Sequence, residues 1–304
     1  DPQRVSEEVR EKLGSDAILM QLPIGLAEDF EGVIDLVRMQ AIYFDGEHGE
    51  TLREEQIPEE LLDQAGTARM AMLEQLSMYS DELMEKLLNE QEISETLIHQ
   101  VTRDAVQQLD AAPVFLGSAF KNKGIQPLLD AVTRYLPSPL EREITASSYQ
   151  DPEQSITLSA DPAALLVGMA FKLVDDAFGQ LSFMRIYQGT VAKGETYFNQ
   201  RTGNKERFSR IYRMHSDKRV EIDEATAGDI VAVMGIDAAS GDTYASKRDF
   251  CTLESIYVPP PVITIAVNPE NRNDADRLGK ALARFRKEDP TFQVRSDQES
   301  GEIL

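Results

Sequence analysis

The sequence is poor in the residues that build several common kinds of site. Its 304 residues include one cysteine, three histidines and no tryptophan, and no apolar run approaches the roughly 18 residues that cross a bilayer. The lone Cys251 excludes an internal disulfide framework and fits a reducing cytoplasm. His48, His99 and His215 show no metal-ligand spacing. These absences predict a cytoplasmic protein with no membrane span, no disulfide and no histidine metal site.

Positive charge is also scarce, and it is unevenly distributed. The formal net charge is −22, and residues 1–112 hold 26 Asp or Glu against 8 Lys or Arg, a net of −18. Residues 201–219 hold 7 Lys or Arg against 2 Asp or Glu, a net of +5. RNA repels an acidic chain at long range, so this local basic segment predicts a phosphate contact with folded RNA. The alternative is a solvated hairpin.

The candidate RNA-binding residues of this segment are Arg201, Lys205, Arg207 and Arg213. A glycine turn at Gly203 is followed by a strand, and strand side chains alternate between two faces. The alternation predicts one face made of Arg207, Ser209, Ile211 and Arg213, and another made of Phe208, Arg210, Tyr212 and Met214.

Residues 113–140 predict a strand, a loop and a helix. Residues 113–116 (Pro-Val-Phe-Leu) are a short apolar run typical of a buried parallel strand, and Gly-Ser-Ala-Phe then turns the chain. Pro127 suits the first turn of a helix. The apolar positions of that helix are Leu128, Leu129, Val132 and Leu136. In α/β sheets ligands bind at the carboxyl ends of strands, so the loop at 117–120 is a candidate site.

The same segment carries a family resemblance. Gly-Ser-Ala-Phe-Lys-Asn-Lys-Gly, followed by Leu-Leu-Asp-Ala-Val and Leu-Pro-Ser-Pro-Leu, resembles the end of the GTP-binding domain of the bacterial elongation factor G family. In that family Ser-Ala-Phe is the last of five nucleotide-binding motifs. The resemblance implies that Ser118, Ala119 and Phe120 contact the guanine base. Backbone N–H groups of such a turn can donate to the purine carbonyl oxygen, and the small Ala119 lets the chain come close.

Residues 1–112 are expected to combine helices and strands. A helix is predicted over 3–13, and strands over 17–22, 32–37 and 40–44, with a polar loop over 45–55. Residues 58–109 predict helices, with Ser80 and Ser94 as caps and the methionines as core filler. Met-Gln-Leu-Pro-Ile-Gly and Gly-Val-Ile-Asp-Leu-Val resemble the insert that the family carries in its GTPase domain, here about residues 17–112.

The outer faces of the insert's expected helices are densely acidic. They carry Glu74, Glu82 and Glu85, among other carboxylates. These charges indicate either a solvated face or a docking surface for a cationic partner. The family resemblance implies the ribosomal stalk protein as that partner.

The remainder predicts a linker and two further domains. Residues 141–163 read as an exposed linker, and 164–258 as short strands separated by glycines, including one over 252–258, which suggests a closed β-barrel. A proline hinge at 259–261 precedes a strand at 262–267, a helix capped by Asp274 and a strand at 291–295, an unfinished ferredoxin-like α+β unit over 259–304. Ala-Phe-Lys-Leu and Glu-Asp-Pro-Thr-Phe-Gln-Val-Arg resemble the family's second and third domains.

The expected fold class is therefore multidomain α/β plus β. It comprises the end of a P-loop-type GTPase domain with its α+β insert (1–140), a β-barrel and part of a third domain. The chain is expected to be an internal fragment of a longer protein, because the family continues on both sides of the matched region.

Several residues of GTP hydrolysis are missing from the sequence. No G-x-x-x-x-G-K-[ST] occurs, and residues 176–179, which fit a loose D-x-x-G, are better explained as a hairpin turn. Residues 122–125 begin like the guanine-reading N-K-x-D, but Ile125 replaces the carboxylate, so Lys121 and Lys123 are interpreted as solvated. The fragment is expected to bind no GTP or GDP, and Mg²⁺ and catalysis belong to the parent protein.

The resemblance implies a ribosomal translocation GTPase that moves tRNA and mRNA, with the ribosome, its small-subunit RNA and its stalk protein as partners. Residues 175–178 and 237–240 differ from the residues usual in the family at these positions. These differences concern the expected ribosome contacts more than the expected fold. The alternatives are a non-enzymatic RNA-binding or adaptor module, or a related translational GTPase such as release factor three, a tetracycline-protection protein or a recycling paralogue.

Overall fold

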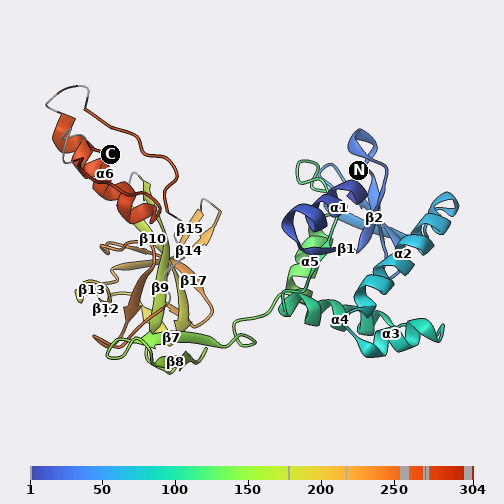
Figure 1. The fold of residues 1–304 in the computed structure, drawn as a ribbon, viewed down its shortest axis with the longest axis horizontal. Coiled ribbons are helices and arrows are strands. Elements are labelled where there is room, and N and C mark those ends of the chain that lie inside the picture. Colours follow the sequence, from blue (N-terminus) through green and yellow to red (C-terminus); the bar gives the residue numbers. More distant parts are fainter. Residues whose placement is uncertain are drawn as a thin grey trace. The chain divides into compact units, whose positions relative to one another are not determined.

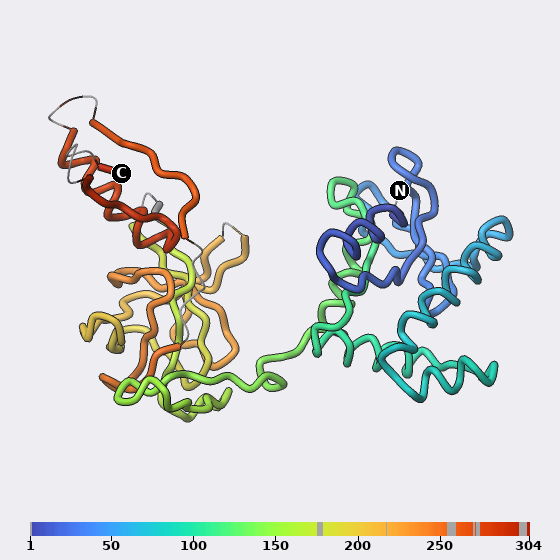
Figure 2. The backbone as a smooth tube through the Cα atoms, in the orientation of Figure 1, coloured from blue at the N-terminus to red at the C-terminus, as the bar shows by residue number. Residues whose placement is uncertain are grey.

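The computed structural model describes residues 2–176, 179–216, 218–253, 260–269, 271, 274–297 and 303–304. The chain forms two compact units, Asp1–Pro137 (unit 1) and Ser138–Leu304 (unit 2). Figures 1 and 2 show that the chain passes once from the first unit to the second. Most of the strand expected at 252–258, the first residue of the proline hinge and residues 177–178 of the loose D-x-x-G lie outside the described residues.

Unit 1 contains a parallel pair of short strands that carries the candidate turn. Strand β1 (Asp16–Leu19) pairs with β6 (Ala111–Val114), and β6 is half-buried along its length. Helix α1 (Pro2–Leu13) packs on β1, while α5 (Ile125–Tyr135) packs on α4 (Glu95–Gln107). The strand, turn and helix predicted at 113–140 are therefore present, with the turn between β6 and α5.

The apolar positions expected for the helix after the turn are largely exposed in the described structure. Ala131 and Tyr135 are the buried residues of α5, with 6% and 3% exposed. The four apolar positions named from the sequence are exposed by 44–59%, namely Leu128, Leu129, Val132 and Leu136. Helical spacing shows that apolar residues share one face of the helix, but it does not show whether that face is buried.

A four-stranded antiparallel sheet forms the β part of the insert. Its order is β2-β3-β4-β5. The strands are β2 (Gln21–Ile24), β3 (Gly32–Asp35), β4 (Gln40–Asp45) and β5 (Thr51–Glu55). The single strand expected over 17–22 is divided at Met20 between the two sheets of unit 1, and β5 occupies part of the expected loop. Every residue of β5 is exposed, so it shows no apolar alternation from which to predict it.

Three α-helices complete the insert as the periodicity predicts. They are α2 (Leu62–Ser77), α3 (Asp81–Leu88) and α4, and two 3-10 turns lie at Ala27–Asp29 (η1) and Glu59–Leu61 (η2). The hydroxyls of Ser80 and Ser94 accept hydrogen bonds from backbone N–H groups at the starts of α3 and α4, which confirms both caps. The methionines are only partly core: Met72 is buried, whereas Met78 is 74% exposed.

Unit 2 is built on an eight-stranded antiparallel sheet with a two-stranded β11-β16 pair. The order of the large sheet is β13-β12-β18-β9-β10-β17-β14-β15. Its strands are β9 (Val167–Asp176), β10 (Gly179–Gln188), β12 (Thr196–Asn199), β13 (Lys205–Arg207), β14 (Arg210–His215), β15 (Lys218–Ile222), β17 (Ile230–Met234) and β18 (Asp242–Ala245). The small pair is β11 (Thr190–Ala192) and β16 (Glu224–Thr226).

These strands share one hydrophobic core, but the eight-stranded sheet does not close into a barrel by hydrogen bonds between its edge strands among the described residues. Phe208 is fully buried between the rings of Tyr197 and Tyr244, at centroid distances of 4.8 and 5.4 Å. Among the described strands, β13 and β15 end the order and do not pair with each other. The expected barrel is thus a barrel-like open sheet.

The residues expected to be a linker, 141–163, contain a hairpin instead. Strands β7 (Ile144–Ser148) and β8 (Ser155–Leu158) join β19 (Cys251–Thr252) in a three-stranded sheet. This correction has a non-local cause, because β7 pairs with a strand about a hundred residues later.

The described part of 260–304 contains one helix, α6 (Ala275–Glu288). The strands expected at 262–267 and 291–295 are not formed among the described residues, where Val267 and Ser296 make only isolated bridges to Ile303. Val262 and Ile263 are 96% and 73% exposed, so no neighbouring strand covers this segment in the described structure. No described helix is long and apolar enough to span a membrane.

Candidate functional site

The turn between β6 and α5 is held by backbone hydrogen bonds. The N–H of Ser118 donates to the carbonyl of Lys123 at 2.8 Å, and the reverse bond is 3.1 Å long. Two glycines allow this closure. A Cβ on Gly117 would lie 2.7 Å from the Lys123 carbonyl oxygen, and one on Gly124, whose φ is +83°, would lie 2.4 Å from the Leu116 carbonyl oxygen. The sequence Gly-Ser-Ala-Phe-Lys-Asn-Lys-Gly therefore folds as a closed turn with a fixed tip.

The tip of this turn offers two backbone donors to a ligand. Ala119 and Phe120 are exposed, and the Phe120 side chain is fully so. Among the described residues, their N–H groups donate to no other group, whereas those of Lys121 and Asn122 bond back to the turn. Two unpaired N–H groups beside a small side chain fit the carbonyl oxygen of a purine. They do not provide a phosphate cradle.

The two lysines of the turn remain partly exposed, as the sequence interpretation expects, but both also bind backbone carbonyls of the insert. Lys121 Nζ donates to the carbonyl oxygen of Glu28 at 2.9 Å, and Lys123 Nζ to that of Phe30 at 3.1 Å. Two amide side chains reach a second loop of the insert. Asn122 Nδ2 donates to the His48 carbonyl at 2.8 Å.

The second amide is on the first turn of α5. Gln126 Nε2 donates to the Gly49 carbonyl at 3.1 Å. The backbone is also in close contact, since a Cβ on Gly49 would lie 2.8 Å from the Asn122 carbonyl oxygen. The turn is thus joined to insert loops 26–30 and 46–50. No sequence signal marks these contacts, because their acceptors are backbone carbonyls far away in the chain.

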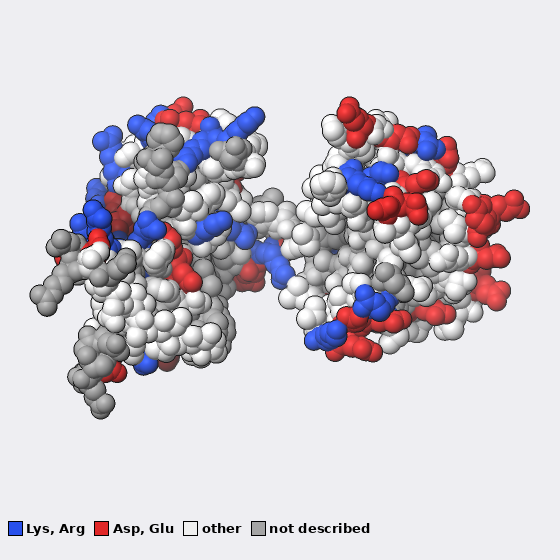
Figure 3. Space-filling model, turned by 90° about the horizontal axis from the view of Figure 1, so that it is seen from above, with Lys and Arg blue, Asp and Glu red and all other residues white. Residues whose placement is uncertain are grey.

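The acidic candidates of the insert remain exposed. Glu74 lies on α2, and Glu82 and Glu85 lie on α3. Figure 3 shows acidic side chains gathered along the rim of unit 1 where α2 and α3 lie. Two apolar side chains on the same helical segment, Met78 and Leu88, are 74% and 78% exposed. The helices therefore present carboxylates together with uncovered apolar groups.

The basic segment 201–219 is only partly free for a ligand. Lys205 is exposed on β13, with its Nζ 5.8 Å from the centre of the Phe198 ring. Arg207 Nε donates to the Gly194 carbonyl at 2.9 Å, and Arg213 Nη2 lies 3.6 Å from Asp229. Figure 3 shows many other Lys and Arg side chains on the visible face of unit 2.

The predicted alternation along this segment is wrong. The strand is broken between β13 and β14, so Phe208 and Ile211 are both fully buried although the alternation predicts opposite faces. Such an irregularity changes which face each residue takes, because strand side chains alternate with period two. The break cannot be read from the sequence pattern.

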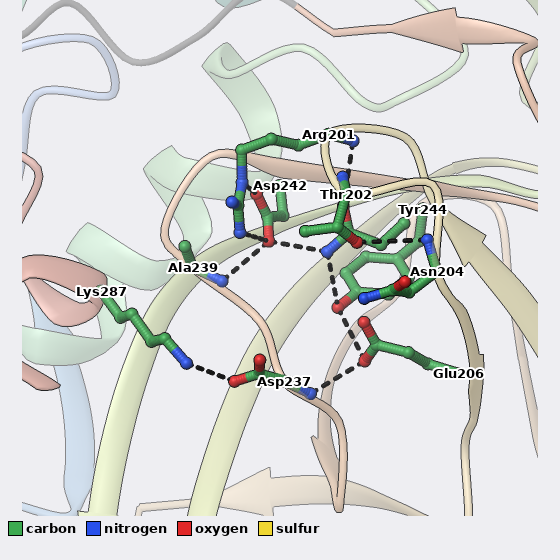
Figure 4. Close-up of polar contacts among 10 residues, drawn as sticks. Arg201, Thr202, Asn204, Glu206, Asp237, Ala239, Asp242, Tyr244 and Lys287 are labelled. Carbon is green, nitrogen blue, oxygen red and sulfur yellow. Dashed lines mark hydrogen bonds and ion pairs between the residues drawn. The ribbon is translucent and has the colours of Figure 1, made fainter. Parts of the chain in front are cut away.

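Arg201 belongs to a polar network of unit 2 (Figure 4). Its guanidinium makes two hydrogen bonds to Asp242, whose side chain is 2% exposed, and these bonds raise the pKa of Arg201. Asp242 also accepts from Asn199 Nδ2 and from the N–H of Ala239, both at 2.8 Å. The carboxylate is therefore fully used inside the unit, while Arg201 keeps a side-chain exposure of 56%.

The same network reaches α6. Glu206 accepts from the N–H of Asp237 at 2.8 Å, and Asp237 pairs with Lys287 on α6 (Figure 4). Ser240 donates from its N–H and its hydroxyl to the carbonyls of Lys287 and Glu288, at 2.9 and 3.0 Å. The loop 235–241 thus caps the carboxyl end of α6, a role that no sequence pattern indicates.

Metal and phosphate groups have no evident place among the described residues. No cluster of three or more His, Cys, Asp or Glu side chains in the described part of the chain could hold a metal ion. The candidate turn has donors that suit a base, whereas its two lysines bind backbone carbonyls and it carries no P-loop sequence for phosphates and Mg²⁺.

Comparisons with known proteins agree with this architecture. The family described as "Elongation Factor G, domain III" matches residues 258–304, and "Elongation factor Tu domain 2" matches residues 179–245. The latter covers much of the barrel-like sheet, and the former includes α6. These matches confirm the second-domain and third-domain assignments of the fold class.

Whole proteins match along the entire chain. "Elongation factor G" of Rhodopirellula baltica is 62% identical over 304 residues, and "Elongation factor G 1" of Syntrophus aciditrophicus and of Treponema pallidum are 44% and 45% identical. Each match covers all of this chain and 44% of the relative, so the chain spans less than half their length. A crystal structure of a Thermus thermophilus protein aligns with the whole chain and 43% of its own, at a TM-score of 0.77 and 25% identity. Over its full length the chain is therefore homologous to bacterial elongation factor G, and it belongs to that family.

Proposed function

We propose that this chain is part of a ribosomal translocation GTPase, which moves tRNA and mRNA on the ribosome in the cytoplasm. The observation that carries this proposal is the 62% identity to an elongation factor G over all 304 residues. Because the chain spans 44% of that relative, GTP hydrolysis with Mg²⁺ is assigned to the complete protein. The chain contributes a base contact, a ribosome-facing sheet and an acidic docking face.

The guanine contact is assigned to Ser118, Ala119 and Phe120. The unpaired N–H groups of Ala119 and Phe120 support it, since an exposed donor pair can bind the base carbonyl without displacing a protein partner. In the full-length protein, Ala119→Asp is expected to weaken GDP binding, because a carboxylate would crowd and repel the base carbonyl. Titration with a fluorescent GDP analogue measures this.

The matched control for this variant is Ala163→Asp. Ala163 is an exposed alanine of unit 2, so the control introduces the same charge away from the turn. Unchanged GDP affinity of Ala119→Asp would remove the turn from the nucleotide site. The isolated chain, which has the turn but no phosphate loop, is expected to show no saturable binding at low micromolar concentration.

The RNA contact is assigned to Arg201, Lys205, Arg207 and Arg213, with small-subunit ribosomal RNA as the partner. The basic segment carries net positive charge in an acidic chain, and its guanidinium groups remain partly exposed beside their protein partners. Paired arginines can still offer their outer N–H groups to a phosphate, because a guanidinium has five donors. Lys205 has no ion-pair partner among the described residues, so it is the cleanest probe.

Lys205→Ala in the full-length protein is expected to weaken ribosome association and to make its salt dependence shallower. One lost phosphate contact should lower the log–log slope by about one. A control at Lys12, which lies on α1 of unit 1, should leave the slope unchanged. Equal slopes for Lys205→Ala and the wild type would leave this segment as an ordinary solvated hairpin.

A further inference from the structure

The contacts between the turn and the insert are more numerous than a solvent-facing turn requires. Side chains of four residues within 121–126 end on backbone carbonyls of the loops 26–30 and 46–50. The acceptors lie 74 to 93 residues earlier in the chain. We call this set of contacts the turn clamp.

The turn clamp consists of two pairs of contacts, and each pair binds a different loop of the insert. Lys121 and Lys123 reach the loop that contains η1, whereas Asn122 and Gln126 reach the loop after β4. Asn122, which has a φ of +52°, lies at the centre, and its own carbonyl faces Gly49. A shift of either loop would therefore displace the backbone that sets the direction of the tip.

Ammonium groups bound to backbone carbonyls make directional, charge-assisted contacts. Such hydrogen bonds are stronger than neutral ones, and an N–H or ammonium left without its partner must be solvated anew. In a chain of net charge −22, both lysines nevertheless bind neutral carbonyls of the insert. Their placement therefore depends on geometry more than on the general attraction of the acidic surface.

We propose that the turn clamp couples the insert to the base-contacting turn, so that the insert sets the affinity for guanine nucleotide. Lys121, Asn122, Lys123 and Gln126 are positioning residues in this arrangement, and none of them needs to touch the nucleotide. The proposal rests on the proposed guanine contact of Ser118–Phe120. Because coupling between two sites is reciprocal, nucleotide on the turn should also order the loops 26–30 and 46–50.

The sharpest test changes the insert loop and leaves the turn's own sequence intact. Gly49→Ala in the full-length protein introduces a Cβ 2.8 Å from the Asn122 carbonyl oxygen. Gly14→Ala is the matched control, because Gly14 has the same φ of +63° but no atom within 4 Å of its added Cβ. Both variants place an alanine at the same left-handed φ, so a difference between them reports contact with the turn.

The expected result is dissociation of a fluorescent GDP analogue about tenfold faster in Gly49→Ala, roughly the effect of one lost hydrogen bond, with Gly14→Ala unchanged. A second variant removes a contact from the other side. Lys123→Met should also accelerate dissociation, Lys123→Arg should recover part of the loss, and Lys86→Met should match the wild type. Recovery by arginine distinguishes positioning through a cation from a general loss of folding.

Hydrogen exchange provides a readout that does not depend on catalysis. In Lys123→Met the amides of residues 26–30 and 118–123 should exchange faster together, while those of α4 remain as protected as in the wild type. If dissociation rates of Gly49→Ala and Lys123→Met equal those of their controls, the coupling is refuted. That outcome is distinct from failure of the guanine contact itself, which would appear as normal GDP binding by Ala119→Asp.

Discussion

At the scale of single residues, Asp242 supports the network in Figure 4 through four hydrogen bonds. It accepts two from Arg201, one from Asn199 and one from the N–H of Ala239, and its side chain is 2% exposed. Loss of this carboxylate would leave a backbone donor and an amide unpaired in the interior. Arg201, by contrast, could turn to solvent.

We therefore expect Asp242→Ala to lower the free energy of unfolding of unit 2 by about 2–4 kcal/mol. Asp242→Asn should cost less, because the amide keeps an oxygen acceptor and the volume. Asp223→Ala, at a carboxylate whose side chain is 94% exposed, is the control and should stay within about 0.5 kcal/mol. Urea denaturation of the three variants measures these differences, and equal losses at Asp242 and Asp223 would contradict the role given to the network.

The pKa of His99 indicates how the stability of unit 1 depends on pH. Burial, followed by the nearby positive charge of Arg134, lowers the pKa of His99, whose Nδ1 lies 2.7 Å from the Tyr135 hydroxyl. The folded state therefore prefers the neutral ring, and the unfolded state binds the proton more readily. The resulting contribution to stability is present above the ordinary histidine pKa of about 6.5 and is lost as pH falls through the lower, folded value.

The expected outcome is a melting temperature of unit 1 that falls more steeply below pH 6.5 in the wild type than in His99→Gln. Glutamine keeps a polar side chain near Tyr135 but does not titrate. The control is His48→Gln, a change at an exposed histidine. Parallel pH profiles for the wild type and His99→Gln would show that this residue does not carry the acid sensitivity.

Residue roles are predictable where they depend on neighbours in sequence. Ser80 and Ser94 are recognisable as caps, because the group that a cap binds lies three residues away. The solvated role predicted for Lys121 and Lys123 misses their hydrogen bonds, because their partners lie 93 residues earlier and are carbonyls that any residue would supply. Charge alone identifies Arg201 as a candidate, yet it does not reveal the pairing with Asp242.

At the scale of elements, two glycines give opposite predictions for the same substitution. Gly66 lies inside α2, is exposed and has no atom within 4 Å of an added Cβ. Gly124 precedes α5 with a φ of +83°, and its Cβ would lie 2.4 Å from the Leu116 carbonyl oxygen. Alanine suits the first position and cannot be accommodated at the second without displacing backbone.

Gly66→Ala is expected to stabilise unit 1 by about 0.5–1 kcal/mol, the difference in helix propensity. Gly124→Ala is expected to destabilise it by at least about 1–2 kcal/mol, the cost of a left-handed residue before any steric contact is counted. Thermal melts of the two variants beside the wild type provide the measurement. Equal signs for the two shifts would contradict the geometry of the turn.

Helices are easier to predict than strands for a physical reason. The periodicity of α2, α3 and α4 is local, so it survives without knowledge of the partner. Strand β7 needs β19 about a hundred residues later, and the all-exposed β5 needs only the backbone of β4. Residues 262–267 show the opposite case. Their apolar, β-branched sequence predicts a strand, but among the described residues they make only an isolated bridge at Val267.

At the scale of the whole molecule, charge differs between parts of the chain. The helices of the insert expose Glu74, Glu82 and Glu85 with the apolar Met78 and Leu88. We propose this face as the docking surface for the ribosomal stalk protein. Charge attraction would raise the association rate, and exposed apolar groups would lengthen the complex lifetime.

Replacement of all three glutamates by lysine is therefore expected to slow stalk-dependent GTP turnover of the full-length protein, mainly through the association rate and most strongly at low salt. The control replaces three exposed carboxylates of unit 2, Asp151, Glu153 and Asp223, which change the net charge equally. Leu88→Ser should instead shorten the lifetime of the complex with little effect of salt. Turnover equal to that of the unit 2 control would leave the acidic face as a solvated surface.

The single thiol of the chain lies in the sheet formed by β7, β8 and β19. Cys251 is fully buried, and burial raises its pKa to about 11. A thiol reagent can attack it only when β19 separates from β7, since the thiolate is both rare and enclosed in the closed sheet. The rate of labelling in native buffer therefore reports how often this sheet opens. Because Cys251 is the one cysteine of these 304 residues, labelling of the isolated chain reports the opening of this sheet with no signal from another thiol.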